Sequence, residues 1–229
     1  MFPRTCVFCD EILTLTEKTK GLCECCNNKI KFVREPKCKK CGKSLMIEEK
    51  EYCNDCMKNE HLYDWGFSAF VYNDLVKKSI YRFKYHNRRE YAYCYGKIIA
   101  DEFYEEISMM NPDVIIPVPI HRKRYMRRGY NQAELLAREL SISTGIPMDN
   151  KILIRVANTR AQKELSVKER HKNLEKAFKI TEDVVKYNKI VIVDDIYTTG
   201  STIDACSKVL LENGAKKIYF ISLSIGMGV

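Results

Sequence analysis

The chain has 229 residues, of which 45% are hydrophobic and 30% are charged, and its formal net charge at pH 7 is +9. This length is enough for one substantial core plus a small module, and the composition is ordinary for a globular protein. No apolar run approaches the ~20 residues of a membrane span, and the N-terminal residues lack the apolar core of a signal peptide. We therefore expect a cytoplasmic protein without a membrane span. The positive charge is compatible with an anionic partner but does not identify one.

The first 56 residues contain nine of the eleven cysteines. A C-x-x-C turn points two thiolates at one ion, and two such turns complete a tetrahedral zinc site. In a cytoplasmic chain this pattern favours metal over disulfides, so we predict two structural Zn²⁺ sites. The spacing favours pairing the first turn with the second and the third with the fourth, and it leaves a cross-braced pairing open. The predicted ligands are Cys6, Cys9, Cys23, Cys26, Cys38, Cys41, Cys53 and Cys56.

Two roles stay open for this cysteine-rich module, namely docking of a protein partner and contact with nucleic acid. The segment 27–43 supports nucleic-acid contact because it is rich in Lys and Arg. Polar neighbours such as Glu24, Lys39 and Asn54 leave little apolar core, so we expect the module to be unfolded without metal. Residues 57–68 resemble a short linker. We therefore divide the chain into a double zinc-ribbon module, 1–60, and a second domain, 61–229.

The second domain begins with elements of alternating type. A strand is expected near 67–72, followed by helices at 75–85 and 92–110, where apolar residues recur at helical spacing. The first of these helices ends in a basic cluster that includes Arg82, Lys84 and Arg88. A short buried strand near 113–119 ends in Pro117-Val118-Pro119, which sets a rigid turn.

A basic run follows this turn. Five of the eight residues 121–128 are Lys or Arg, and Tyr125 and Tyr130 lie among them. Such a run is often a solvated surface, but here it lies between a predicted strand and the predicted helix 133–140, so it could supply cations to a bound anion. Aromatic residues among cations are also typical of single-strand nucleic-acid grooves. Farther on, we expect a loop at 157–163 and a polar helix or extended chain at 168–178.

The stretch 190–202, IVIVDDIYTTGST, is the most informative part of the chain. Its apolar run predicts a buried parallel strand, with Asp194 and Asp195 at the carboxyl end, where open α/β sheets bind ligands. The residues after Tyr197 form a loop that leads into a helix N-terminus, which is an anion site. Carboxylates beside an anion site suit a ribose 5-phosphate. A helix containing Ile203 and Cys206, which we expect Asn213-Gly214 to end, and a strand at 216–223 complete a mainly parallel α/β sheet.

This stretch resembles the phosphoribosyl pyrophosphate (PRPP) signature of type I phosphoribosyltransferases. The resemblance implies that Asp194 and Asp195 hold the ribose hydroxyls as the catalytic pair, and that PRPP binds with Mg²⁺. The loop that would bind the 5′-phosphate consists of Thr198, Thr199, Gly200, Ser201 and Thr202. By position, the turn after the 113–119 strand would line the pyrophosphate pocket through Val118, Pro119, His121 and Arg122.

The order of the motifs along the whole chain resembles the ComF/GntX family of competence-associated proteins. The paired C-x-x-C turns are followed by PVPIHRKRYMRRGYNQAELLA, TRAQKELSVKERHKNLEKAF and IVDDIYTTGST. The resemblance implies a role in DNA uptake, with single-stranded DNA or a helicase as partner. Two alternatives stay open: an active phosphoribosyltransferase acting on an unidentified nucleophile, and a PRPP-sensing regulator. Enzyme activity is undecided because position 198 is threonine, so the loop itself carries no carboxylate base.

Overall fold

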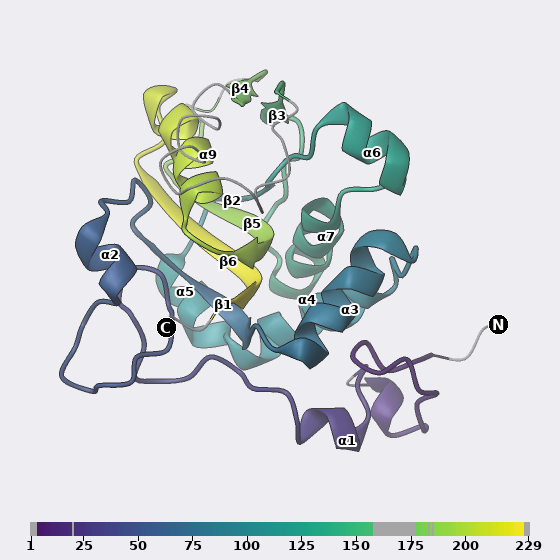
Figure 1. Ribbon diagram of the computed structural model, residues 1–229. Helices are drawn as coiled ribbons and strands as arrows, with labels where there is room; N and C mark the ends of the chain where they lie inside the picture. The colour runs from purple at the N-terminus through teal and green to yellow at the C-terminus, as the bar shows by residue number, and fades with distance from the viewer. Residues whose placement is uncertain (1–3, 20, 158–176, 183, 185, 227–229) are drawn as a thin grey trace.

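The structure is a computed structural model that describes residues 4–19, 21–157, 177–182, 184 and 186–226 (Figure 1). Its centre is a parallel sheet of four strands in the order β1-β6-β5-β2, and a two-stranded antiparallel sheet pairs β3 with β4. The α/β class with a mainly parallel sheet is therefore confirmed. The segment 158–176, which holds most of the expected loop and polar segment, lies outside the described residues. The strands are β1 Trp65–Val71, β2 Val114–Pro117, β3 Leu153–Arg155, β4 Phe178–Ile180, β5 Lys189–Tyr197 and β6 Lys217–Ile225.

Strand β5 continues two residues beyond the acidic pair. Asp194 is opposite Ser222 in β6, and Tyr197 is still opposite Ile225. Cross-strand pairing with β6 therefore carries the strand past the point where its apolar run ends. The two carboxylates lie in the last part of the strand and the loop after it is short, because the next helix already begins at Ser201.

Short helices surround the sheet and the cysteine clusters. The expected helix at 92–110 is interrupted at Phe103, whose ring is buried and stacks on Phe67 with centroids 4.8 Å apart. The basic run forms a helix of its own, which begins after His121 and ends at Gly129, where φ is +79°. The helices are η1 Glu17–Thr19, α1 Glu24–Asn27, α2 Asn54–Lys58, α3 Asp74–Tyr85, α4 Tyr91–Glu102, α5 Tyr104–Met110, α6 Arg122–Arg128, α7 Gln132–Thr144 and α9 Ser201–Glu212.

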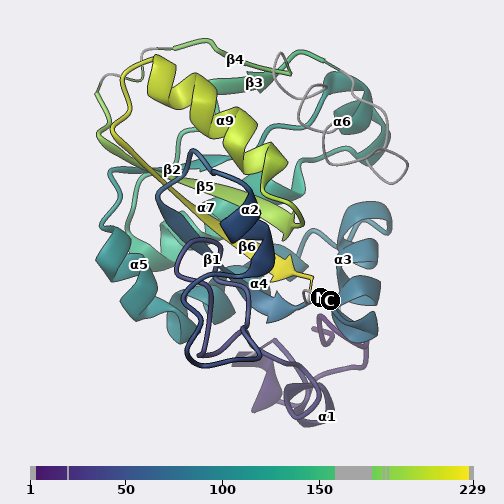
Figure 2. The same cartoon turned by 60° about the vertical axis from the view of Figure 1, so that its left-hand side comes forward.

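Each face of the sheet has its own apolar core. Alternate side chains of β5 point to opposite faces, so Val191 and Val193 enter one core while Ile190 and Ile192 enter the other. Helices α3, α4, α5 and α7 cover the first face, and α9 with β3 and β4 covers the second (Figure 2). Within the described part of the chain, no helix combines the length and the apolar character needed to cross a membrane.

The two cysteine clusters pack on opposite faces of the sheet. Cys6, Val7 and Phe8 belong to the core of the first face, whereas Cys38 and Cys41 belong to the core of the second. The segment that connects them crosses the open edge of β1, where Val33 donates to the Ala69 carbonyl at 3.0 Å and Val71 donates to Lys31 at 2.8 Å. The polar residues beside the cysteines predicted little apolar core for the module. The structure shows that the module instead packs against the apolar cores of the sheet.

Residues 57–68 are not a free linker. Tyr63 is fully buried in the core of the second face, and β1 already begins at Trp65. Asp64 is bonded to β6 twice. Its backbone N–H donates to the Ile218 carbonyl at 2.7 Å, and its carboxylate accepts from the Ile218 N–H at 2.9 Å. These contacts join the end of the cysteine-rich module directly to the sheet.

Candidate functional site

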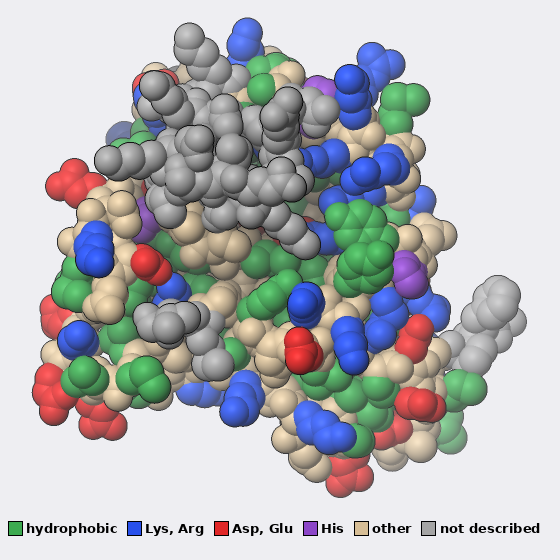
Figure 3. Space-filling model, in the orientation of Figure 1, with side chains coloured by type: hydrophobic (Ala, Val, Ile, Leu, Met, Phe, Trp, Pro, Cys, Tyr) green, Lys and Arg blue, Asp and Glu red, His purple; other side chains and the backbone are tan. Residues whose placement is uncertain are grey.

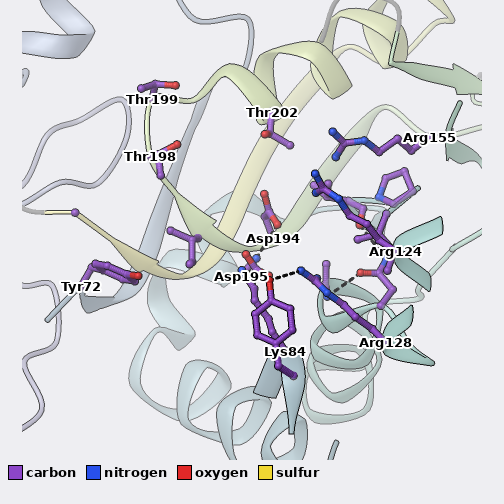
Figure 4. Close-up of a pocket in the computed structure, with 18 of the residues that line it drawn as sticks. Tyr72, Lys84, Arg124, Arg128, Arg155, Asp194, Asp195, Thr198, Thr199 and Thr202 are labelled. Atoms are coloured by element: carbon purple, nitrogen blue, oxygen red, sulfur yellow. Dashed lines mark hydrogen bonds and ion pairs between the residues drawn. The ribbon is translucent and has the colours of Figure 1, made fainter. Parts of the chain in front are cut away.

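A cavity of about 590 Å³ opens at the carboxyl ends of β2 and β5 (Figure 4). Ligands bind at this edge in open α/β sheets, because side chains and loops from neighbouring strands converge there. The lining combines acidic, hydroxyl, basic and aromatic groups. Its residues are Lys43, Tyr72, Lys84, Tyr85, Val118, Pro119, Ile120, Arg124, Arg127, Arg128, Asn131, Ala133, Arg155, Asp194, Asp195, Ile196, Thr198, Thr199, Thr202 and Gly226.

The two adjacent carboxylates have different surroundings. Asp195 forms an ion pair with Lys84 of α3 at 2.8 Å. Asp194 accepts a hydrogen bond from the Asp195 backbone N–H at 2.8 Å. Burial and the neighbouring Asp195 charge raise the pKa of Asp194 to about 7, although Lys84 and Arg155 act in the opposite direction. Near neutral pH the Asp194 carboxyl group can therefore lose its proton, and the carboxylate can then bind a cation or accept hydrogen bonds from ligand hydroxyl groups.

The loop after β5 is shaped as an anion site. Gly200 adopts φ +77°, and a Cβ at this position would lie 2.7 Å from the Tyr197 hydroxyl, so only glycine fits. Gly200 has no side chain to cap α9, and the first N–H groups of this helix are therefore available to a ligand. Thr198, Thr199 and Thr202 line the cavity, whereas Gly200 and Ser201 do not. Ser201 is buried, and its Oγ lies 2.8 Å from Thr199 Oγ1.

A basic wall formed by α6 faces the acidic pair across the cavity. In Figure 4, Arg124 and Arg128 point toward Asp194 and Asp195. Arg128 is held in place, since it donates to Gln132 Oε1 at 2.8 Å and to the Tyr85 hydroxyl at 3.0 Å. Burial, together with the nearby Arg128 charge, lowers the pKa of Arg124. Lys and Arg side chains gather over α6 and the neighbouring end of α3 in Figure 3, so this rim attracts anions.

The residues expected to line a pyrophosphate pocket are divided between two places. Val118 and Pro119 line the cavity, and Asn131 fixes their turn by donating to the Val118 carbonyl at 2.9 Å. His121 instead caps α6, where its Nδ1 accepts from the Lys123 N–H at 3.2 Å. Arg122 lines a separate depression. The guanidinium groups that reach the cavity from the basic run are those of Arg124, Arg127 and Arg128, because spacings of three and four residues, about one helical turn, place them on the same side of α6.

Sequence reasoning did not assign several of the residues that line the cavity. Lys84 is part of the basic cluster at the end of the predicted helix 75–85, and Arg155 begins a second cluster of basic and polar residues farther along the chain, but neither residue had an assigned partner. The ion pair of Lys84 with Asp195 depends on how α3 docks on the sheet. Lys43 comes from the cysteine-rich module, and no local pattern indicated that it would reach this cavity. The one signal in the sequence was that basic clusters recur between the predicted strands, which could have suggested that Lys84 and Arg155 lie near a common anion site.

The cysteines form two tetrads whose geometry fits zinc. In each tetrad the four sulfur atoms lie within 4.8 Å of one another, with Cys9 and Cys23 at 3.6 Å and Cys41 and Cys53 at 3.7 Å. A tetrahedral ion with Zn–S distances of about 2.3 Å would place its sulfurs about 3.8 Å apart. The pairing is sequential rather than cross-braced. The tetrads are Cys6, Cys9, Cys23 and Cys26, and Cys38, Cys41, Cys53 and Cys56.

Comparisons with known proteins find a match for the cysteine-rich segment and another for the sheet domain. Residues 1–57 match the model of the double zinc ribbon domain, and residues 96–224 match that of the phosphoribosyl transferase domain. Competence protein F of Haemophilus influenzae is 34% identical, with 93% of each chain covered. DNA utilization protein YhgH of Salmonella typhimurium is 30% identical over 94% of each chain. Competence protein ComFC of Bacillus subtilis is 28% identical, covering 91% of this chain and 89% of that one. The chain therefore belongs to the competence protein F family and joins a double zinc ribbon to a phosphoribosyl transferase domain.

Proposed function

We propose that this chain binds PRPP with Mg²⁺ in the cavity at the ends of β2 and β5, and that it serves the handling of DNA in the cytoplasm. The observation that carries the proposal is the meeting of two carboxylates, an uncapped helix N-terminus and several guanidinium groups in one cavity. A sugar carrying hydroxyls, a phosphate and a pyrophosphate needs these three kinds of group.

In this proposal each part of PRPP has its own binding groups in the lining. Asp194 and Asp195 accept hydrogen bonds from the ribose hydroxyls, and the loop 198–202 binds the 5′-phosphate through backbone N–H groups and hydroxyls. Arg124 and Arg128 bind the pyrophosphate near Val118 and Pro119. Mg²⁺ would be held by the acidic pair and would neutralise part of the pyrophosphate charge.

Binding is the part of the activity that the cavity supports. Transfer of the phosphoribosyl group also needs an acceptor and, for many acceptors, a group that removes a proton. Among the described residues that line the cavity, the carboxylates are Asp194 and Asp195, and both are assigned to the ribose. An assay of pyrophosphate release from PRPP with candidate bases and amines would detect an active transferase.

The binding proposal is tested by titration calorimetry of zinc-loaded protein with PRPP and Mg²⁺. The double variant Asp194→Asn, Asp195→Asn should lose affinity by at least about 100-fold, because two charged hydrogen-bond acceptors are removed. Asp101→Asn, at an exposed position of α4, is the matched control and should bind normally. Unchanged binding by the double variant would refute the site.

The DNA-handling part of the proposal is supported by the names of the relatives and by the basic rim of the cavity. Tyr125 and Met126 are exposed among the cations of α6, so bases of a single strand could stack there. Binding of oligonucleotides should weaken with salt, with a log–log slope of about 0.7 per neutralised phosphate. A helicase that moves the strand is a further candidate partner.

Charge reversal separates DNA binding from PRPP binding. Arg122 and Lys123 are exposed on α6 and do not line the cavity, so Arg122→Glu with Lys123→Glu should weaken oligonucleotide binding and leave PRPP binding intact. Lys216→Glu with Lys217→Glu, at exposed positions near β6, is the control of equal charge. Equal oligonucleotide affinity in both double variants would show that α6 is not the contact surface.

A further inference from the structure

The second zinc ribbon, which holds Cys38, Cys41, Cys53 and Cys56, contributes a cation to the cavity. Lys43 follows the Cys38/Cys41 turn and lines the cavity together with Thr198 and Thr199. Its side chain is only 8% exposed, and Nζ forms an ion pair with Asp55 of α2 at 2.6 Å. Because the Asp55 side chain is largely exposed, water can solvate its carboxylate. The Lys43 ammonium group can therefore also bind a phosphate in the cavity without leaving a buried, unpaired charge at Asp55.

The position of Lys43 depends on a close fit between the ribbon and β1. Gly42 has φ +68°, and a Cβ there would lie 2.7 Å from the Gly66 carbonyl and 2.9 Å from Phe67 Cα. The Gly66 N–H donates to the Lys40 carbonyl at 3.0 Å, and Cys38 donates to the Lys43 carbonyl at 2.8 Å. The position of Lys43 is therefore fixed by both the metal-binding turn and β1.

The segment after the ribbon supports the phosphate loop from behind. His61 Nδ1 lies 2.8 Å from Asp204 Oδ2, and the Leu62 N–H donates to Asp204 Oδ1 at 2.9 Å. Asp204 is in the first turn of α9, two residues after the loop 198–202. His61 Cε1 would lie 2.8 Å from a Cβ on Gly200, so the imidazole packs against the turn itself.

A tyrosine pair completes this support. The Tyr63 and Tyr197 hydroxyls lie 2.7 Å apart, and Tyr197 is the last residue of β5 before the loop. Both rings pack on Phe220, with centroid distances of 4.9 and 4.8 Å. Lys40 of the ribbon lies over the Tyr63 ring at 5.3 Å. The second ribbon, the segment 61–63 and the phosphate loop thus form one contiguous packed unit.

The described residues of the first zinc ribbon, which holds Cys6, Cys9, Cys23 and Cys26, make no such contacts. None of its described residues lines the cavity. It is fastened to α3 by hydrogen bonds from Ser79 to the Val7 carbonyl and from Arg82 to the Phe8 carbonyl. Arg82 and Lys84 are two residues apart on α3, so they point to nearly opposite sides of the helix.

We propose that Zn²⁺ in the second ribbon, and not in the first, controls ligand affinity of the cavity, with Lys43 as a phosphate-binding residue. The inference builds on the proposed PRPP binding and adds a site residue and a metal dependence to it. Loss of zinc from the second tetrad frees Lys43 and the segment 61–63, and the phosphate loop then loses its support.

Matched ligand variants test the metal dependence. Cys9→Ser and Cys56→Ser each change one half-buried thiol, and each should lower the zinc content by one ion per chain. Calorimetry with PRPP and Mg²⁺ should show at least about tenfold weaker binding for Cys56→Ser and a change below about twofold for Cys9→Ser. Equal affinities of the two variants would overturn the proposal.

Hydrogen exchange of the ligand-free proteins separates this inference from PRPP binding itself. Cys56→Ser should accelerate amide exchange in residues 197–204, and Cys9→Ser should leave these amides protected. This result would support the coupling even if the unchanged protein failed to bind PRPP, in which case only the proposed function would be wrong. Unaltered exchange in Cys56→Ser would overturn the coupling.

A variant that keeps both zinc sites tests Lys43 directly. Lys43→Met should weaken PRPP binding by about tenfold, because an ion-assisted hydrogen bond is lost, while the zinc content stays at two. Lys39→Met is the control, since Lys39 lies in the same ribbon, is exposed and pairs with Glu51 away from the cavity. Normal binding by Lys43→Met would remove this residue from the site.

Discussion

The two zinc ribbons share a sequence pattern and a metal geometry but have different surroundings. Phe8 of the first ribbon packs edge-on against Phe70 and Tyr95, with centroids 5.4 and 6.1 Å away, in the core under α3 and α4. The second ribbon packs near Tyr63, Tyr197 and Phe220, where the sheet meets the cavity. The difference teaches that the motif specifies the metal site, while the packing partner of each ribbon determines what the site can influence.

The edge of β1 explains how neighbouring ribbons reach opposite faces. Phe32 and Phe70 of β1 form an antiparallel backbone bridge. Side chains of an extended segment alternate between the two faces of the sheet. Ile30 accordingly joins the core of the first face and Val33 that of the second. This pairing also covers an otherwise open sheet edge.

The largest effects on stability are expected where a ribbon, or the segment directly after it, inserts an aromatic ring into the sheet's core. Phe8→Ala and Tyr63→Ala should each lower the free energy of unfolding by about 3–5 kcal/mol, because both rings are fully buried. Urea denaturation measures this loss. Leu15→Ala and Met46→Ala, exposed positions in the first and second ribbons, are the controls. A small effect of either core variant would mean that the ring it removes does not stabilise the sheet's core.

A smaller effect is expected at the hydrogen bonds that fasten the first ribbon. Ser79 donates to the Val7 carbonyl and also contacts the Tyr95 hydroxyl, and all three groups are buried. Ser79→Ala should cost about 1–3 kcal/mol, because polar groups are left without partners. Thermal unfolding measures this cost, and a chelator competition should show weaker zinc binding at the first site only. Ser108→Ala, on an exposed surface of α5, should do neither.

The tyrosine pair behind the loop 198–202 should give a still smaller change in stability. Tyr63→Phe removes one hydroxyl from the contact with Tyr197 and should cost about 1 kcal/mol, measured by urea denaturation. Amides of the loop 198–200 should exchange faster in this variant. Tyr52→Phe, at an exposed tyrosine of the second ribbon, is the reference. Protected loop amides in Tyr63→Phe would contradict the support that we assign to the pair.

The smallest effect is expected for the surface ion pair beside the connection between the ribbons. Arg34 and Glu102 lie 2.6 Å apart, but both side chains are substantially exposed. Glu102→Gln should therefore change the free energy of unfolding by less than about 1 kcal/mol. A larger loss in urea denaturation would indicate that charge, rather than pairing with β1, holds the connecting segment.

The sequence by itself determined the elements that depend on local pattern. Four C-x-x-C turns indicated the eight ligands of two metal sites, although the sequential pairing came from the structure, and helix α3 and strand β5 followed from apolar spacing and from a continuous apolar run. The acidic pair and the loop before α9 were likewise readable, since they follow one another in the chain. These pieces were enough to indicate the family and to place the candidate site at the carboxyl end of β5.

Only the tertiary structure decided which distant residues complete the site. Lys43, Lys84 and Arg155 reach the cavity from three separate elements, and their convergence depends on how those elements dock. The placement of the ribbons on opposite faces likewise depends on pairing with β1, to which Lys31 and Val33 are joined only after folding. Contacts between residues far apart in the chain leave no periodic trace in the sequence, which is the physical reason that local patterns could not predict them.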